Sequence, residues 1–428
     1  MSTIVIGAGP AGLAAARTLG REGEDVVVLE AQPHVGGRTR SVRDRLRHGQ
    51  PADLGASFID IGQDKLLQYC AALGVDLTPQ VALFPTDPDG RLTAASPLRV
   101  TLVVDGKRLD DAERDWLADE VRSALEATPP ERTEPIPAWA ARAGLSPRTR
   151  RMFCWQTGYN PVHEASQVPM AMLEPPHVGR VCWMMADGTD ALARAMAAGV
   201  DVRLEQPVRA VRRRRGHLVV ETDTDRFTAD DVVVATPVTP SLAIGFDPVL
   251  PAWKVDALLA TPMTQGGKVI GQYADGAALV ERLGLSTMSD GPISLAWARP
   301  VGPEDTVVVL GLLADRGDGV LRDEARCLRA LDELLGAATG LPVQRLAGLV
   351  QDWTREPYAG GVVSTLMGDF PRLPSLLAQG VGPIHFAGEH TAEMWQTSMD
   401  GALRSGERAA AEVLHRRHLR RPIATLTS

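Results

Sequence analysis

The sequence predicts an α/β fold containing a Rossmann-like domain, and three observations predict it. A β-branched run, Thr3–Ile6, is typical of a buried strand. The pattern G-x-G-x-x-G follows at residues 7–12 and leads into an alanine-rich helical run that extends to about Leu19. A second apolar strand, Val26–Leu29, then ends on the acidic residue Glu30. Strand, glycine turn, helix and strand in this order form the first βαβ unit of a doubly wound sheet.

The glycine turn predicts a dinucleotide site. Gly7 permits the tight turn, Gly9 lets the backbone approach a pyrophosphate, and Gly12 lets helix and strand pack closely. Pro10 and Ala11 lie at the start of the helix, whose free N–H groups and partial positive charge attract phosphates.

The acid at the end of the second strand indicates which dinucleotide binds. Glu30 follows Gly12 by 18 residues, a distance at which a carboxylate accepts hydrogen bonds from a ribose diol. Because an acid there disfavours a 2′-phosphate, NAD or FAD is favoured over NADP. The alternative interpretation is an ordinary glycine-rich strand–helix turn without a ligand.

The composition excludes several classes of protein. With 45 basic and 53 acidic residues the net charge is −8, whereas nucleic-acid-binding proteins are usually basic. The four cysteines form no C-x-x-C pair and no metal-ligand spacing with histidine, so neither a metal site nor disulfides are expected. No apolar stretch approaches a membrane span and no signal peptide is recognisable. A cytoplasmic protein without membrane or nucleic-acid partners is therefore expected.

Lysine is rare in this chain. Among the basic residues only Lys65, Lys107, Lys254 and Lys268 are lysines. Lys268 lies in the run Met263–Tyr273, whose alternation and β-branching predict a strand. Burial of an ammonium group in an apolar strand is costly, which makes Lys268 a candidate functional residue. The alternative is an edge-strand lysine with its amine in solvent.

Two segments after Glu30 carry a family resemblance. The runs Ala31–Thr39 and Ala52–Phe58 resemble the flavin-containing amine oxidase superfamily, which includes monoamine, polyamine, L-amino-acid and protoporphyrinogen oxidases. The resemblance implies FAD as cofactor, and two glycines beside an arginine suit a pyrophosphate contact. The cofactor-binding residues implied here are Ala31, Gly36, Gly37, Arg38, Gly55, Ala56 and Ser57, with Phe58 as a substrate-pocket candidate.

The resemblance recurs in three further blocks. By resemblance the Val208 backbone lies against the adenine, and Lys268 matches a lysine that holds a water against flavin N5. Gly388 and Glu389 lie along the ribityl-phosphate, and the Met399 N–H caps the flavin pyrimidine edge at a helix N-terminus. That N–H and the helix dipole would stabilise negative charge on reduced flavin.

The family fold implies two interleaved domains. A glutathione-reductase-like, Rossmann-like FAD-binding domain would comprise residues 1–80, 183–248 and 350–418, and an α+β substrate-binding domain residues 81–182 and 249–349. A helix is expected from Asp110 to Ala127 and another from Leu403 to about His415. The basic run Arg416–Arg421 is expected to fray, and residues 419–428 form a tail.

The sequence departs from the family pattern at two places. Val362 stands where monoamine oxidases attach FAD through cysteine, so non-covalent FAD is expected. Val363 and Ser398 stand at the positions of two aromatic rings that hold the amine in many relatives. Rings from nearby Trp353 and Trp395 are further pocket candidates.

The leading hypothesis is an FAD-dependent oxidase of an amine or amino-acid-like C–N bond. Hydride transfer to flavin N5 would give an imine, and O2 would reoxidise the flavin and form H2O2. The alternative is an FAD-dependent desaturase or dehydrogenase of a biosynthetic intermediate, suggested by the missing aromatic pair. A flavoprotein without turnover and a plain NAD dehydrogenase are less favoured. The sequence does not identify the substrate, and it leaves open whether the protein forms a homodimer.

Overall fold

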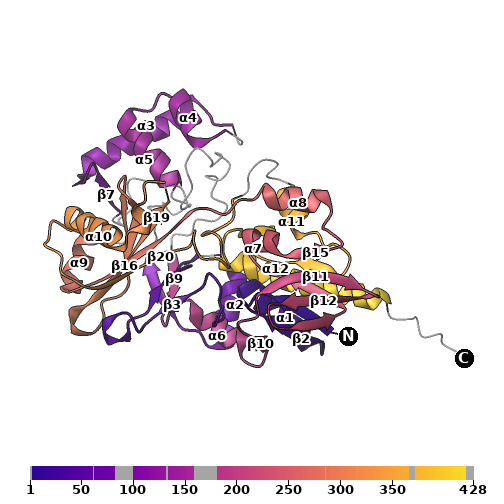
Figure 1. Ribbon diagram of the computed structural model, residues 1–428. Coiled ribbons are helices and arrows are strands. Elements are labelled where there is room, and N and C mark those ends of the chain that lie inside the picture. The colour runs from indigo at the N-terminus through magenta and orange to yellow at the C-terminus, as the bar shows by residue number, and fades with distance from the viewer. Residues whose placement is uncertain are drawn as a thin grey trace, which may run out of the picture.

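The computed structural model describes residues 2–60, 62–81, 100–131, 134–158, 181–284, 286–315, 317–365 and 372–420. A five-stranded sheet carries the glycine turn (Figure 1). Its order is β10–β2–β1–β14–β21, and all neighbours pair in parallel. The strands are β1 (Ser2–Ile6), β2 (Asp25–Leu29), β10 (Asp201–Arg203), β14 (Asp231–Val234) and β21 (Ile384–Phe386). This parallel sheet confirms the predicted α/β, Rossmann-like fold.

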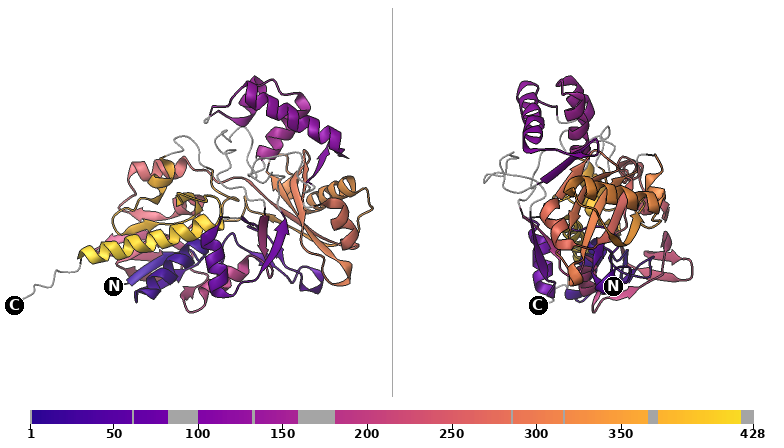
Figure 2. Two further views of the ribbon diagram at one scale, coloured as in Figure 1. Left: turned by 180° about the vertical axis from the view of Figure 1, so that it is seen from behind. Right: turned by 90° about the vertical axis from the view of Figure 1, so that its left-hand side faces the viewer.

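Different layers cover the two faces of this sheet. On one face α1 (Pro10–Arg21) packs against α12 (Met399–Arg420), seen from behind in Figure 2. Small residues allow the close approach, since a Cβ added at Gly406 would lie 2.1 Å from the Ala11 carbonyl oxygen. The other face packs on a four-stranded sheet. That sheet contains β11 (Val208–Arg214), β12 (His217–Thr222), β13 (Arg226–Ala229) and β15 (Gly245–Asp247).

A seven-stranded sheet forms the core of the other half of the molecule. Its order is β20–β16–β19–β18–β17–β7–β8. Helices α9 (Gly276–Leu283) and α10 (Glu324–Thr339) cover one face, and the opposite face packs on residues 52–54. The strands are β7 (Val100–Val104), β8 (Lys107–Arg108), β16 (Gly266–Tyr273), β17 (Ser286–Ser289), β18 (Ile293–Ala298), β19 (Val307–Ala314) and β20 (Arg345–Asp352).

Smaller elements connect the two large sheets. A three-stranded sheet and a two-stranded sheet lie in the first 185 residues. Their strands are β3 (Ser41–Val42), β4 (Ala52–Asp53), β5 (Ile59–Asp60), β6 (Leu77–Val81) and β9 (Val181–Met185). Further helices are α2 (Asp64–Leu73), α6 (Asp190–Ala197), α7 (Val238–Ala243), α8 (Ala252–Leu259) and α11 (Leu373–Ala378). The 3-10 turns are η1 (Arg47–Gly49), η4 (Pro303–Asp305), η5 (Val320–Arg322) and η6 (Glu389–Thr391).

Three helices stand at one end of the molecule. They are α3 (Asp111–Ala127), α4 (Ile136–Arg142) and α5 (Pro147–Gly158), and both views of Figure 2 place them beyond the seven-stranded sheet. Helix α3 starts one residue after the predicted start. Asp110 is its N-cap and forms a capping box with Glu113. No helix in the described ranges is both long and apolar enough to cross a membrane.

The last helix differs from the prediction. It runs to Arg420, so the expectation that the basic run frays from Arg416 was wrong for its described part. Arg417 is buried, and its guanidinium donates to the Asp231 carboxylate at 3.0 Å and to the Thr3 hydroxyl at 2.7 Å. A tertiary ion pair with the first residue of the interior strand β14 holds the helix end. Residues 421–428 of the predicted tail lie outside the described ranges.

A second buried lysine provides a test of fold stability. Lys254 on α8 is fully buried, and its Nζ donates to the carbonyl oxygens of Leu376 and Leu377, each at 2.8 Å. Burial and nearby Arg408 lower the pKa of Lys254 to about 7. We expect Lys254→Met to lower the free energy of unfolding by about 1–3 kcal/mol, because two buried acceptors lose their donor.

The pH dependence of that loss has a definite sign. The unfolded chain binds a proton on Lys254 up to about pH 10, whereas the folded chain releases it above about pH 7. Folding is therefore favoured increasingly as pH rises from 7 towards 10. Denaturant unfolding at pH 6 and pH 9 measures the free energy of unfolding of wild type and Lys254→Met. The difference in favour of the wild type should be larger at pH 9, and an equal difference at both pH values would contradict the lowered pKa of Lys254.

Candidate functional site

The glycine turn has the backbone geometry that a dinucleotide requires. Gly7 adopts φ +102°, and a Cβ at Gly12 would lie 1.9 Å from the Gly7 carbonyl oxygen. Helix α1 starts at Pro10 with Gly9 as its N-cap, so Pro10, Ala11 and Gly12 form the first turn. The N–H groups of a first turn have no intrahelical acceptors and point out of the helix end.

A second pair of glycines faces this helix end. Gly36 and Gly37 have φ values of +109° and +54°, which favour glycine. The Gly36 N–H donates to the Ala8 carbonyl oxygen at 2.9 Å, and a Cβ at Gly37 would lie 3.7 Å from Gly9 Cα. Bare backbone from two turns therefore meets at the N-terminus of α1. This cradle fits a pyrophosphate group.

Glu30 closes one side of the cradle. Its carboxylate is buried and accepts the N–H of Ala8 in the glycine turn at 2.6 Å and the N–H of Gln32, the residue after Ala31, at 2.9 Å. Burial raises the pKa of Glu30 above its ordinary value. The Glu30 carbonyl oxygen accepts the N–H of Gln206, which brings the segment before Val208 beside it. Val208 itself begins β11 and is half-buried.

Half-buried Arg38 and buried Glu389 form an ion pair that joins distant segments. Arg38 Nη1 lies 2.9 Å from Glu389 Oε1 and 3.0 Å from the Val362 carbonyl oxygen. Glu389 also accepts from the hydroxyl of Ser364 at 2.5 Å and from the N–H of Thr397 at 3.2 Å. Burial alone would raise the pKa of the Glu389 carboxyl, but Arg38 and the other donors hold it below its ordinary value.

Gly388 and Met399 complete this part of the site. Gly388 adopts φ +136° and donates its N–H to the Ser405 hydroxyl at 2.9 Å. Met399 is the first residue of α12. The Ser398 hydroxyl accepts the Gly401 N–H at 3.2 Å, so Ser398 caps the helix. The first-turn N–H of Met399 is thus placed at a helix N-terminus.

One face of the seven-stranded sheet presents a row of side chains to residues 53–58. Because strand side chains alternate, Lys268 lies on the same face of β16 as Ile270, and Trp297 on the same face of β18 as Arg299. Residues 53–58 run opposite this face. Leu54 and Phe58 of this segment pack in the same hydrophobic cluster as Ile270 and Trp297.

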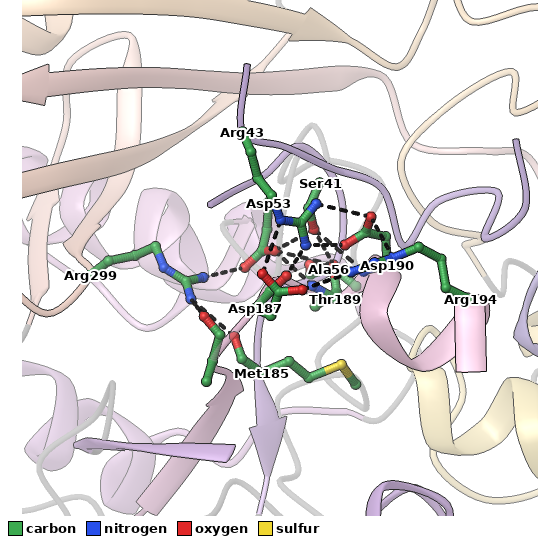
Figure 3. Close-up of polar contacts among 11 residues, drawn as sticks. Ser41, Arg43, Asp53, Ala56, Met185, Asp187, Thr189, Asp190, Arg194 and Arg299 are labelled. Atoms are coloured by element: carbon green, nitrogen blue, oxygen red, sulfur yellow. Dashed lines mark hydrogen bonds and ion pairs between the residues drawn. The ribbon is translucent and has the colours of Figure 1, made fainter. Parts of the chain in front are cut away.

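Each member of the row contacts residues 53–58. Lys268 Nζ donates to the Ser57 hydroxyl at 2.6 Å, and the Phe58 ring centroid lies 4.7 Å from that of Trp297. Arg299 Nη1 lies 2.9 Å from Asp53 Oδ2 (Figure 3). Lysine, aromatic ring and arginine are thereby held against one short segment.

Lys268 is buried and has neutral acceptors. Its Nζ also donates to the Asp53 backbone carbonyl at 3.2 Å and lies 4.8 Å from the Trp297 ring centroid. Burial lowers the pKa of Lys268 to about 7, with Asp53 raising and Arg299 lowering it. The lysine therefore exchanges a proton near neutrality.

The neighbouring residues Gly55 and Ala56 shape the segment. A Cβ at Gly55 would lie 1.8 Å from the Arg38 carbonyl oxygen, so only glycine fits there without a shift. The Ala56 N–H donates to the same oxygen at 3.1 Å. Segment 53–58 is thereby tied to the second glycine turn.

The remaining pocket candidates fall into two groups. Trp353 is buried next to Gly55, and its indole N–H donates to the Leu54 carbonyl at 2.7 Å. Trp395 lies near Gly62 before the start of α12, and Val363 exchanges hydrogen bonds with Thr264. The structure thus places Phe58 and Trp353 in or beside segment 53–58, and Trp395 and Ser398 at the start of α12.

Two members of the site have no role that the sequence pattern predicts. Asp53 lies within the run Ala52–Phe58, and its position before Leu54-Gly55 was the available signal. Arg299 follows an apolar strand and has no local signal, because its partner is 246 residues away. Among the described residues no cluster of three or more His, Cys, Asp or Glu is arranged to hold a metal ion.

Comparisons with known proteins agree with this geometry. A Mycobacterium tuberculosis protein, provisionally named flavin-containing monoamine oxidase AofH, is 30% identical over 96% of both chains. Human flavin-containing amine oxidase B is 26% identical, over 96% of this chain and 86% of its own length.

Solved structures show the same fold. Cyclohexylamine oxidase from Brevibacterium oxydans superposes with a TM-score of 0.81 at 21% identity, covering 98% of this chain and 99% of its own. Putrescine oxidase bound to putrescine gives a TM-score of 0.77 at 21% identity, covering 97% and 99%.

A family model decides the membership. The model of the flavin containing amine oxidoreductases matches residues 10–414. This confirms the resemblance seen in the sequence and the expectation of a flavin-dependent oxidoreductase that uses FAD. The chain belongs to the flavin containing amine oxidoreductase family.

Proposed function

We propose that this protein is an FAD-dependent oxidase that acts on the C–N bond of an amine or amino-acid-like substrate. The substrate would lose a hydride from its α-carbon and a proton from nitrogen, and the resulting imine would hydrolyse to a carbonyl compound and a free amine. When bound, FAD would supply the acceptor for that hydride, and transfer of two electrons and two protons to O2 would give H2O2. The observation that carries the proposal is buried Lys268, held by neutral acceptors opposite residues 53–58.

The chain's own residues would bind and orient the cofactor. The N-terminus of α1 and the glycine cradle fit the pyrophosphate, and Glu30 fits the adenosine ribose. Val208 would lie against the adenine, and the N–H of Met399 would donate to the pyrimidine edge of the flavin. The complete proposed set is Gly7, Gly9, Pro10, Ala11, Gly12, Glu30, Ala31, Gly36, Gly37, Arg38, Gly55, Ala56, Ser57, Val208, Gly388, Glu389 and Met399.

Lys268 would act in the reaction of the reduced cofactor with O2. Its amine has a pKa of about 7 and donates a hydrogen bond to the Ser57 hydroxyl. The amine can therefore hold a water molecule and exchange a proton with that water. Trp297 limits its motion from one side. These contacts support a role in the oxygen half-reaction rather than in fold stability alone.

We expect the cofactor to be held without a covalent bond. Val362 carries no nucleophile, and its carbonyl oxygen is bound by Arg38. Acid denaturation of the yellow protein should therefore release all of its flavin as free FAD into the supernatant. Flavin that remains on the precipitated chain would contradict this prediction.

The substrate class is tested by reduction of the flavin. Because Val363 and Ser398 are not aromatic, a dehydrogenase or desaturase of a biosynthetic intermediate is the second candidate. An anaerobic screen with amines, amino acids and cyclic intermediates should bleach the flavin absorbance for true substrates. Subsequent air should yield H2O2 and a released amine if the oxidase proposal holds. Bleaching without either product would favour the second candidate.

A further inference from the structure

Asp53, whose backbone carbonyl accepts from Lys268, has a carboxylate that is occupied by other partners. Asp53 is fully buried, and Oδ2 lies 2.9 Å from Arg299 Nη1. Its Oδ1 accepts from the Ser41 hydroxyl at 2.7 Å and from the Thr189 N–H at 2.9 Å (Figure 3). Both oxygens are therefore satisfied without the lysine.

Lys268 is left with uncharged acceptors. Lys268 lies beside Asp53, but its Nζ donates to the backbone carbonyl of Asp53 and to the Ser57 hydroxyl. It does not bond to the Asp53 carboxylate. No carboxylate among the described residues forms an ion pair with it. A buried ammonium without a counterion is strongly disfavoured, whereas a neutral amine matches these partners.

We infer that Arg299 is a positioning residue, which holds the Asp53 carboxylate away from Lys268 and so favours the uncharged amine form of that lysine. This inference deepens the proposed function, because the charge of Lys268 affects turnover only if Lys268 acts. Arginine suits the role since its guanidinium stays charged at all relevant pH values. A lysine in contact with the free carboxylate would instead form a buried ion pair and keep its proton.

Independent contacts hold Arg299 in place. Its Nη2 donates to the carbonyl oxygens of Met185 and Ala186, each at 3.0 Å, at the end of β9. Burial alone would lower the pKa of Arg299, and the Asp53 carboxylate opposes this. Strand β18, strand β4 and the end of β9 thus meet at one guanidinium.

The other charged groups around Arg299 are paired among themselves. Arg43 binds Asp187 and Asp190, and Arg194 binds the same two carboxylates (Figure 3). These ion pairs surround the Asp53–Arg299 pair but supply no second cation to Asp53. Only Arg299 among the charged residues of the described network bonds to that carboxylate.

The rarity of lysine makes the inference directly measurable. Protein labelled with 13C and 15N only in lysine gives signals from four side chains, which Lys→Met variants assign. The titration of each amine can then be followed by NMR without substrate or turnover. In the wild type we expect the Lys268 midpoint near 7.

Substitutions at Arg299 should move that midpoint. In Arg299→Met the released carboxylate turns to the lysine, and the midpoint should rise by about one to two pH units. Arg299→Lys should stay close to wild type. Arg194→Met, which removes an arginine from the outer ion pairs, is the matched control and should leave Lys268 unchanged. An unshifted midpoint in Arg299→Met would overturn the inference.

A variant at Asp53 covers the case in which Arg299→Met does not fold. Asp53→Asn keeps the shape but removes the charge, so the Lys268 midpoint should fall below that of the wild type. A rise or no change would overturn the inference. If Lys268→Met leaves flavin reoxidation unchanged while these shifts occur, the proposed catalytic role fails and the role of Arg299 in setting the lysine charge stands.

Discussion

Replacing Lys268 with methionine should slow the reaction of the reduced flavin with O2 by about 100-fold or more, while FAD stays bound. Methionine has similar length and suits the apolar surroundings, but it cannot donate to Ser57 or exchange a proton. Stopped-flow mixing of the anaerobically reduced protein with oxygenated buffer measures the rate. The wild-type rate should also change with an apparent pKa of about 7, and the variant should lose that dependence.

A matched control separates chemistry from packing. Lys254→Met removes the other buried lysine, whose amine binds the carbonyl oxygens of Leu376 and Leu377. It should lower stability but leave the reoxidation rate within about twofold. The amine of Lys254 bonds to α11 and not to Lys268 or residues 53–58, so its loss acts mainly on stability. Equal reoxidation rates for wild type and Lys268→Met would remove Lys268 from the mechanism.

Replacing Gly12 with alanine should abolish stable FAD binding. The added Cβ would lie 1.9 Å from the Gly7 carbonyl oxygen and 3.1 Å from the Gly7 carbonyl carbon, so the backbone of the glycine turn must move. Such a forced shift in a packed interior costs about 2–3 kcal/mol. The first turn of α1 would then no longer point at the cradle formed with Gly36 and Gly37. Absorbance at flavin wavelengths after gel filtration measures the retained cofactor.

Gly20 provides the control for this substitution. It lies on the same helix, and a Cβ there would meet no atom within 4 Å. Gly20→Ala should keep full flavin content and raise the free energy of unfolding by about 0.5–1 kcal/mol, the usual gain for alanine in a helix. Full flavin retention by Gly12→Ala would show that the turn tolerates the shift and would refute the packing argument.

The cofactor-binding turns were predictable because their constraints are local. A left-handed glycine such as Gly36 or a first-turn glycine such as Gly12 is set by backbone sterics over a few residues. The same holds for Lys268, since an ionisable side chain in an apolar run is visible without its neighbours. The fraying predicted at Arg416 failed for the opposite reason, because Arg417 bonds to Asp231 from another part of the chain.

The sequence by itself therefore determined the fold class, the cofactor turns and the candidate lysine. Only the tertiary structure decided what surrounds them. Arg38 and Glu389, each identified separately, form an ion pair across 351 residues, and Arg299 meets Asp53 across 246. Such pairs depend on strand register and on how two sheets face one another. Side-chain identity specifies a charge, but its partner, and with it the protonation of Lys268, is set by packing at long range.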